Sequence, residues 1–201
     1  LESYLGSTYV NKYIERKKYL RMALIFLLII AGLNMMLTYQ RNKIWKDDYT
    51  LWADCLKKSP HKARVNNNYA NALGGIKGQV KDSLYYYDKA IRLSPGFIYL
   101  YNNRGAAYAK LGLYQKAIED YDKAIRLNRD HFSAYYNRAN AYTALGQNQM
   151  AIADYRQAIH LSPKFANAYI NLGIVQVKLG HYQEAMDNCS QAIRLKPRDP
   201  N

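Results

Sequence analysis

The sequence contains very few residues of the kinds that form disulfide frameworks and metal sites. Its two cysteines, Cys55 and Cys189, are too few and too far apart for a disulfide framework or a zinc site of paired cysteines. No nucleophile elbow, phosphate-binding loop or isolated carboxylate pair is present. The histidines fall at unrelated repeat positions and match no metal-ligand spacing: His61, His131, His160 and His181. We therefore expect no catalytic site, no metal and no cofactor in this chain.

Acidic residues are also scarce, with 15 Asp and Glu against 29 Lys and Arg, which gives a formal net charge of +14. Such a balance favours anionic partners such as lipid headgroups or nucleic acid. Apolar residues make up 49% and charged residues 22% of the chain, which excludes wholesale disorder. Because the first residue is Leu1 rather than methionine, we expect a processed product or a piece of a longer protein.

One long apolar run lies near the start. Residues 22–40, between Arg21 and Arg41, read MALIFLLIIAGLNMMLTYQ and would span about 28 Å as a helix, close to the ~30 Å hydrocarbon core. We expect Met22 to Gln40 to cross a bilayer and contact lipid; a buried helix or a signal-peptide core is the alternative. Basic residues are more frequent in the flank, residues 1–21 (Lys12 among them), than after the run. The positive-inside rule then places the N-terminus in the cytoplasm and the later residues outside it.

The rest of the sequence is repetitive. Three copies of 34 residues align without gaps, at 98–131, 132–165 and 166–199, and a fourth copy at about 63–97 has one additional residue near Gly74. Aromatic, glycine, alanine and proline positions recur at fixed offsets. Each copy is therefore predicted to form two amphipathic helices joined by a tight turn. The recurring residues are Tyr101, Tyr135 and Tyr169; Gly112, Gly146 and Gly180; Ala117, Ala151 and Ala185; Ala124, Ala158 and Ala192; and Pro95, Pro163 and Pro197.

This pattern resembles the tetratricopeptide repeat. The resemblance implies an all-α fold, a right-handed α-solenoid of about four helical hairpins over residues 63–201, whose stacking forms a concave groove. Residues 41–62 are expected to form a junction and a capping helix, which follow the transmembrane helix. Tyrosines at packing positions are expected in the core: Tyr101, Tyr108, Tyr114, Tyr121, Tyr135, Tyr142, Tyr155, Tyr169 and Tyr182.

Asparagine occupies the sixth position of every first helix, at Asn68, Asn103, Asn137 and Asn171; we call these residues the asparagine ladder. In tetratricopeptide families this position faces the groove. A side-chain amide offers both a donor and an acceptor, so it can pair with the backbone of an extended peptide. The ladder resembles those of peptide-binding relatives; the alternative is a polar residue merely tolerated on an open helix face.

Further groove positions refine the expected ligand, a protein or an extended peptide. Asn102, Tyr136 and Asn140 make the first three repeats neutral, Ile170 and Ile174 make the fourth apolar, and Lys110 and Lys178 are the main charges. Chaperone-binding relatives grip a C-terminal carboxylate with basic residues. Because Asn67, Ser133 and Asn137 occupy those places here, chaperone-tail binding is not expected.

A second resemblance covers the junction. The residues that carry it are Thr38, Arg41-Asn42, Trp45, Leu51-Trp52, Ser59-Pro60 and Ala63-Arg64. They are similar to the point where polytopic membrane glycosyltransferases of the O-mannosyltransferase type pass into tetratricopeptide repeats. The resemblance implies that catalytic acids belong to an upstream membrane domain and that this chain positions protein acceptors.

Two functions remain open: a membrane-anchored scaffold for protein–protein interaction, as an assembly factor or accessory subunit of a membrane complex, and the acceptor-binding end of a longer glycosyltransferase. Nucleic acid is not an expected partner, because Asp88 and Asp122 interrupt the basic row of the second helices. Glu119, Asp120 and Asp122 are expected on a solvated face.

The last hairpin carries an apolar pair, Met186 and Ile193. In earlier copies the equivalent residues are expected to be covered by the next hairpin. Because the sequence reaches Asn201 soon after this pair, we expect Met186 and Ile193 to be exposed and to form an end-cap contact with a second copy or another subunit.

Overall fold

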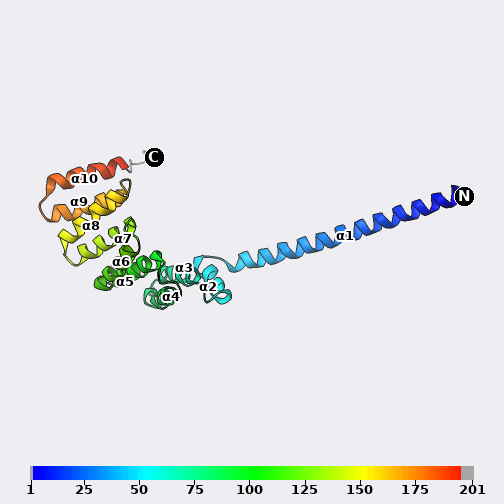
Figure 1. The fold of residues 1–201 in the computed structure, drawn as a ribbon, viewed down its shortest axis with the longest axis horizontal. Coiled ribbons are helices and arrows are strands. Elements are labelled where there is room, and N and C mark those ends of the chain that lie inside the picture. Colours follow the sequence, from blue (N-terminus) through cyan, green and yellow to red (C-terminus); the bar gives the residue numbers. More distant parts are fainter. Residues whose placement is uncertain (1, 196–201) are drawn as a thin grey trace. The chain divides into compact units, whose positions relative to one another are not determined.

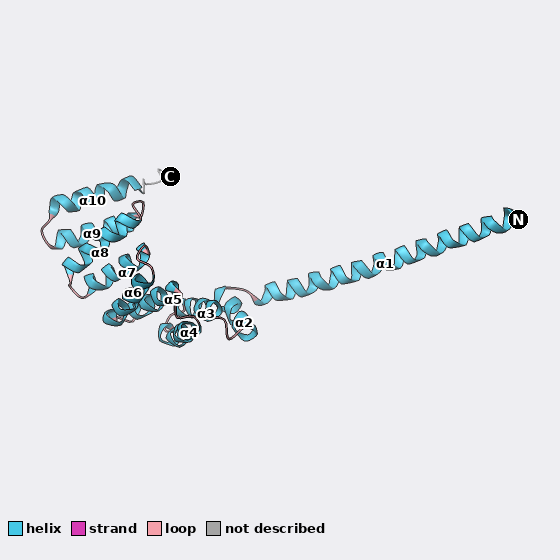
Figure 2. Cartoon of the chain, viewed as in Figure 1, coloured by secondary structure: helices cyan, strands magenta, loops and turns pink. Residues whose placement is uncertain are grey.

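The computed structural model describes the backbone of residues 2–195 and the side chains of residues 16–195 except Arg41 and Ile44. Over this range the chain is helical and contains no strand (Figure 2). The expected positions of Pro197 and of residues 196–199, and the side chain of Lys12, lie outside the described residues. The helices are α1 (Glu2–Ile44), α2 (Asp48–Lys58), α3 (Ala63–Gly75), α4 (Val80–Leu93), α5 (Ile98–Lys110), α6 (Tyr114–Leu127), α7 (Phe132–Ala144), α8 (Asn148–Leu161), α9 (Ala166–Lys178) and α10 (Tyr182–Leu195).

The chain divides into two compact units, Leu1–Leu51 and Trp52–Asn201. The first unit is dominated by α1. Within it, Arg16–Gln40 has a mean hydropathy of 2.2, is exposed along its length, and is long and apolar enough to cross a membrane. A membrane anchor and a signal sequence both meet these criteria.

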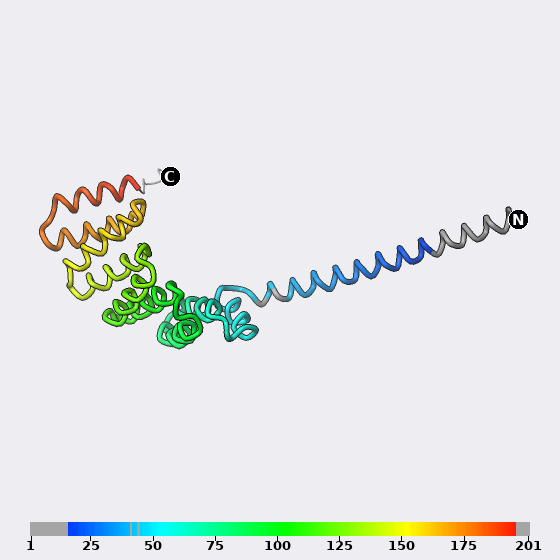
Figure 3. Tube along the Cα trace, in the orientation of Figure 1, coloured from blue at the N-terminus to red at the C-terminus, as the bar shows by residue number. Residues whose placement is uncertain are grey.

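The second unit is a row of hairpins. Helices α3 and α4, α5 and α6, α7 and α8, and α9 and α10 pair with each other, and the second helix of each pair packs on the first helix of the next. Figure 1 shows α3 to α10 following one another in this order, and Figure 3 traces the same course of the chain. The predicted all-α solenoid of four hairpins is confirmed.

The turns inside the hairpins depend on glycine. Gly112, Gly146 and Gly180 have φ angles of 74°, 74° and 80°, in the left-handed region where a Cβ atom is strained. In the first hairpin, which has one additional residue, Gly78 takes this role with a φ angle of 84°. The repeated glycines therefore end the first helices, as the sequence predicted.

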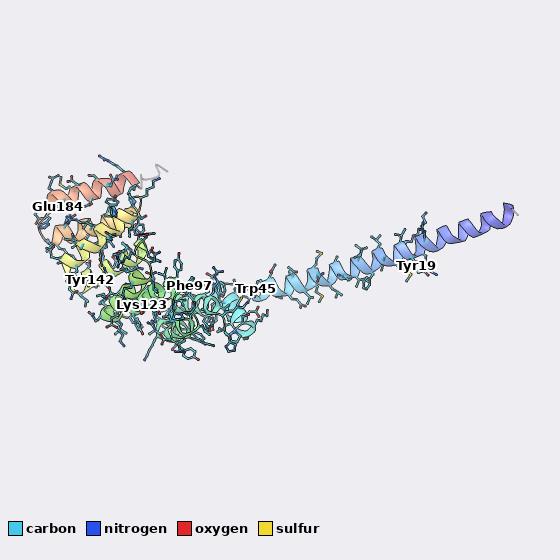
Figure 4. All side chains as sticks on the ribbon, viewed as in Figure 1. Tyr19, Trp45, Phe97, Lys123, Tyr142 and Glu184 are labelled. Atoms are coloured by element: carbon cyan, nitrogen blue, oxygen red, sulfur yellow. The ribbon has the colours of Figure 1, made fainter. Side chains whose placement is uncertain are left out.

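Large tyrosines packed against small residues form the core between the paired helices. Tyr121 is 1% exposed, and a Cβ atom at Gly105 would lie 2.7 Å from its Cε1 atom. Ala117 and Ala124 are fully buried beside it. Figure 4 shows the side chains that fill the spaces between hairpins, and labels Tyr142, another buried residue of this core.

One tyrosine does not follow the expected pattern. The packing predicted for Tyr182 is wrong, since this residue is 65% exposed. Its equivalent Tyr114 packs against a core cluster that includes Tyr142 of the next hairpin. Among the described helices none stacks on α10 in this way, so Tyr182 has no such neighbour.

The expected capping helix corresponds to α2. Its start is fixed by a reciprocal cap: the Asp47 carboxylate accepts from the Thr50 backbone N–H at 2.8 Å, and Thr50 Oγ1 accepts from the Asp47 backbone N–H at 3.2 Å. No residue of α2 is fully buried. Trp52 is half-buried and lines a cavity with residues of α3 and α5.

Candidate functional site

The asparagine ladder links the hairpins to one another. Asn103 Nδ2 donates to Asn67 Oδ1 at 3.0 Å, across the first hairpin boundary. Asn137 Nδ2 donates to Asn102 Oδ1, also at 3.0 Å, across the second. At the third boundary Asn171 Nδ2 donates to the Tyr136 hydroxyl at 3.1 Å. The ladder therefore makes the same inter-hairpin hydrogen bond three times.

The residues that receive these bonds, Asn67, Asn102 and Tyr136, occupy equivalent places in successive first helices, and we call them the acceptor positions. An asparagine amide has two N–H donors and a carbonyl oxygen. The bonds to the acceptor positions use one N–H each of Asn103 and Asn137. Both ladder residues are half-buried. Each therefore retains one N–H and its Oδ1 atom for a ligand.

A second set of hydrogen bonds holds the neighbouring asparagines. Tyr87 donates from its hydroxyl to Asn71 Oδ1 at 2.5 Å, and Tyr155 donates to Asn140 Oδ1 at 2.6 Å. Burial raises the pKa of Tyr87 to about 12, so its phenol remains protonated and donates at neutral pH. These tyrosines fix the orientation of the amides beside the ladder.

Two open cavities lie beside the first two ladder residues. The larger has a volume of about 590 Å³ and is lined by Trp52, Arg64, Asn67, Asn68, Asn71, Phe97, Tyr99 and Asn103. The smaller has about 250 Å³ and is lined by Asn71, Gly74, Val80, Tyr87, Asn103, Ala106, Ala107 and Lys110. Asn71 and Asn103 belong to both linings. Amides, aromatic rings and single basic groups therefore surround this part of the ladder.

The remaining predicted groove residues divide into three groups. Asn102 and Asn140 take part in the hydrogen bonds between hairpins. Ile170 and Ile174, at 40% and 50% exposed, make no contact with a further hairpin among the described residues. The two predicted groove lysines, Lys110 and Lys178, are both exposed. Asn102 and Asn140 thus take part in bonds at two different hairpin boundaries, and the fourth repeat's isoleucines make no such bond.

The structure contains two arginine-centred ion-pair clusters that were not predicted from the sequence, and we call them the arginine triads. Arg104 binds Asp120 through Nε at 2.8 Å and NH2 at 2.6 Å, and binds Asp88 of the preceding hairpin at 2.7 Å. Arg138 binds Asp154 through two atoms at 2.7 Å and Asp122 at 2.5 Å. Each triad connects two adjacent hairpins.

The solvated position expected for Asp120 is wrong, because this residue is only 5% exposed. Burial raises the pKa of the Asp120 carboxyl, and the hydrogen bonds from Arg104 act in the opposite direction. Those same bonds, together with the bond to Asp88, raise the pKa of Arg104. The recurrence of Arg104 and Arg138 at the repeat interval was the signal that could have revealed the triads.

The fourth hairpin has no arginine triad. Leu172 stands where Arg104 and Arg138 stand in the earlier copies, and Asn188 replaces the buried aspartate. A cavity of about 280 Å³ lies here. Polar groups still connect across it: Asn188 Nδ2 donates to Gln176 Oε1 at 2.8 Å, and Gln176 Nε2 donates to Glu184 Oε2 at 2.6 Å.

Within the described residues, no group of three or more His, Cys, Asp or Glu side chains could hold a metal ion. The polar groups of the ladder are amides and phenols, which are suited to hydrogen bonding. Their arrangement supports binding and offers no recognisable catalytic constellation.

The fold and the repeated inter-hairpin bonds define an α-solenoid of helical hairpins. Models of the tetratricopeptide repeat match residues 98–131, 120–153 and 166–199, and a model described as TPR repeat matches residues 139–180. Together these matches cover residues 98–199. The chain belongs to the tetratricopeptide-repeat family.

Among curated proteins, the chain is similar to Protein O-mannosyl-transferase TMTC1 of Homo sapiens, with 35% identity over 68 residues, 34% of this chain and 8% of that protein. It is also similar to Protein O-mannosyl-transferase Tmtc3 of Drosophila melanogaster, with 28% identity over 101 residues, 50% of this chain and 10% of that protein. The match therefore spans about a tenth of each relative.

Solved structures show the same fold. A crystal structure of MamA is 25% identical with a TM-score of 0.65 and covers 72% of this chain and 84% of that chain. The first tetratricopeptide domain of Spaghetti (RPAP3), bound to the HSP90 peptide SRMEEVD, is 28% identical with a TM-score of 0.57. That match covers 59% of this chain and 94% of that chain.

Proposed function

We propose that this protein is an interaction scaffold whose solenoid binds an extended segment of a partner protein along the asparagine ladder. The observation that supports this function most directly is the spare hydrogen-bonding capacity of Asn103 and Asn137. Each amide is held in place by a bond to the preceding hairpin and retains a donor and an acceptor. A fixed amide with both groups matches the N–H and C=O of an extended backbone.

The spacing of the ladder suits such a ligand. Helices pack roughly 10 Å apart, whereas an extended chain advances about 3.3 Å per residue. Successive ladder asparagines therefore meet about every third residue of the bound segment. Because backbone groups carry no sequence information, side-chain preference comes from the cavities beside the ladder, the larger of which is lined by Trp52, Phe97 and Tyr99.

The charges around the ladder favour a different ligand from the acidic peptide bound by the Spaghetti (RPAP3) domain. A carboxylate clamp needs basic side chains, and Asn67, Ser133 and Asn137 occupy the corresponding places here. Asn67 is 6% exposed and is already engaged by Asn103. The proposed ligand is an internal, largely neutral segment, with a single anionic group accommodated near Lys110.

We also propose that residues 22–40 anchor the scaffold in a membrane, with the repeats on the non-cytoplasmic side. The apolar stretch Arg16–Gln40 has the length and hydropathy of a membrane span. Arg16, Lys17 and Lys18 lie at the N-terminal end of this stretch, and positive charge there favours the cytoplasm. The scaffold then gathers its partners at the membrane surface.

A pair of double variants tests binding by the ladder. Asn103→Ala with Asn137→Ala removes two ladder amides and two inter-hairpin bonds. The matched control is Asp88→Ala with Asp122→Ala. It also removes one bond across each of the same two hairpin boundaries, but these bonds belong to the arginine triads. Each lost neutral hydrogen bond costs about 0.5 to 1.5 kcal/mol and each bond between charged groups about 1.5 to 3 kcal/mol, so the control should lose at least as much stability as the ladder variant.

The binding assay uses the full chain in detergent micelles and a library of short unstructured peptides, with SRMEEVD as a separate probe. We expect neutral peptides to bind the native chain and the control alike, and to bind the ladder variant at least tenfold more weakly. Peptide binding that survives loss of both ladder amides would contradict the proposal, as would a library from which no peptide binds.

The second candidate function is the acceptor-binding end of a membrane glycosyltransferase. The observation in its favour is the 35% identity with Protein O-mannosyl-transferase TMTC1 over 68 residues. This function requires further apolar segments and catalytic acids upstream of Leu1, whereas the scaffold function requires none. Sequencing the transcript upstream of Leu1 distinguishes the two functions.

A further inference from the structure

Besides the arginine triads, each hairpin of the solenoid contacts the next through two further sets of residues. The first is a pair of apolar residues on its second helix. Ile118 of α6 and Ile152 of α8, which are the first member of this pair in two successive hairpins, are 5% and 6% exposed because the following hairpin covers each of them. The second is the acceptor position on its first helix, which receives the N–H of the next ladder asparagine. The surface that a hairpin presents to the next hairpin is therefore apolar on its second helix and polar on its first helix.

The fourth hairpin presents the equivalent surface, but this surface is apolar on both helices. The equivalents of the apolar pair, Met186 and Ile193, are 59% and 68% exposed. On α9, the acceptor position carries Ile170, and Ile174 and Val177 continue its row, at 40%, 50% and 50% exposed. We call these five residues the end face. No helix in the described part of the chain covers it.

The isoleucine at the acceptor position determines which partner surface can pack on the end face. A repeat of the same type would bring its ladder asparagine against Ile170 and Ile174, which offer no side-chain acceptor. Burying an amide without a hydrogen-bond partner is unfavourable. Head-to-tail stacking of a second copy would create this mismatch, because the first hairpin carries Asn68 at the ladder position.

We propose that the end face binds the end face of a second copy of this chain about a twofold axis. The contact uses the surface that each earlier hairpin presents to the hairpin after it. Because both surfaces are apolar at the acceptor position, a twofold contact leaves no ladder amide unpaired. In such a contact a patch meets itself, so the interface needs no second complementary surface. The end face also forms a row of exposed apolar groups of a kind that marks interaction sites.

The surrounding charges are compatible with this arrangement. Exposed Lys178 and Arg194 are next in sequence to Val177 and Ile193, and exposed Asp187 is next to Met186. A twofold contact between rims that carry both signs can oppose a cation of one copy to an anion of the other. This inference does not depend on peptide binding by the ladder.

The chain has a natural reporter for this contact. Cys189 lies between Met186 and Ile193 on α10 and is exposed. In a Cys55→Ser background it is the single cysteine. The experiment uses the full chain, reconstituted in liposomes for treatment with a short bifunctional thiol crosslinker, and in detergent micelles for sedimentation. We expect a crosslinked dimer and a sedimentation limit at two copies.

Variants then separate the end face from other causes of association. Met186→Asp should weaken the dimer about 100-fold, because the twofold axis counts the substitution twice; Ile193→Asp should act alike. The matched control is Met150→Asp. Met150 is 53% exposed, and the equivalent positions in α4 and α10 already carry acidic residues, Asp82 and Glu184. It should dimerise as the native chain does. Circular dichroism verifies that each variant is folded.

Three results would overturn the inference. One is a native chain that remains monomeric at every concentration tested. Another is a dimer that survives both end-face substitutions, which would place the contact elsewhere, for example in α1. The third is growth beyond two copies with rising concentration, the behaviour of head-to-tail stacking.

Discussion

Replacing Arg138 with leucine tests how far the arginine triads stabilise the solenoid. Arg138 makes two hydrogen bonds at 2.7 Å to Asp154 and one at 2.5 Å to Asp122. Asp154 is only 6% exposed, so the substitution leaves a buried carboxylate without its counterion. Breaking a buried pair in this way costs about 3 kcal/mol or more.

The fourth hairpin suggests how the loss can be reversed. There the equivalents of Arg138 and Asp154 are Leu172 and Asn188, a neutral combination that the fold already contains. Adding Asp154→Asn to Arg138→Leu removes the unpaired charge, so the double variant should recover most of the lost stability. The matched control is Arg156→Leu, whose ion pair with Glu184 has side chains 62% and 50% exposed; such pairs contribute about 0 to 1 kcal/mol.

Thermal unfolding followed by circular dichroism measures these differences. For a chain of this size each 1 kcal/mol shifts the midpoint by about 2 to 4 °C. Arg138→Leu should therefore lower the midpoint by about 6 to 12 °C, and the control should lower it by at most about 4 °C. The reasoning is refuted if Arg138→Leu melts like the control, or if Asp154→Asn adds to the damage instead of repairing it.

Three further predictions concern packing, pH and topology. Gly105→Ala should cost about 1 to 3 kcal/mol through overpacking against Tyr121, whereas Gly75→Ala, with nothing within 4 Å of the new Cβ atom, should melt nearly as the native chain does. Because burial raises the pKa of Tyr87 to about 12 from 10.0, the unfolded chain loses this proton first. Stability should thus fall as the pH rises through this interval, and denaturant titrations of Tyr87→Phe should show a smaller fall. A reporter active only in the cytoplasm, fused to the C-terminus, should be silent in cells if residues 22–40 span the membrane as proposed, and carbonate washing should not release the protein; the opposite outcomes would contradict the orientation and the anchor respectively.

The hairpin architecture was predictable because it depends on local chemistry repeated at a fixed interval. Gly112 and Gly146 mark positions that require a positive φ angle, and buried alanines mark close helix approach. Both signals recur every 34 residues, so each copy confirms the others. The end of each first helix followed from the repeated glycines.

The partners of polar side chains were less predictable. Asp120 looked solvated because its neighbours in sequence are charged, yet its counterion Arg104 lies 16 residues away on the paired helix. The ladder asparagines were expected to face a ligand, and the structure shows that they also bind Asn67 and Asn102. Helical periodicity gives the face of a residue but not its bonding partner on another helix.

The contact surface formed by Ile170 and Ile174 was also not predictable, because periodicity does not give the partner of a residue on another helix. The sequence predicts that they are groove residues that make the fourth repeat apolar. Their equivalents Tyr136 and Asn140, however, receive hydrogen bonds from Asn171 of the following hairpin. Only the observed bonds show that these positions also contact the following hairpin.

Backbone recognition by the asparagine ladder is tested most directly by a methylation scan of a bound peptide. Each backbone N–H of the peptide is replaced in turn by N-methyl, which removes one donor. If Oδ1 atoms of Asn103 and Asn137 accept from the backbone, methylation should weaken binding at positions about three residues apart and leave the intervening positions nearly unchanged. Equal effects at every position, or none at any, would contradict the account.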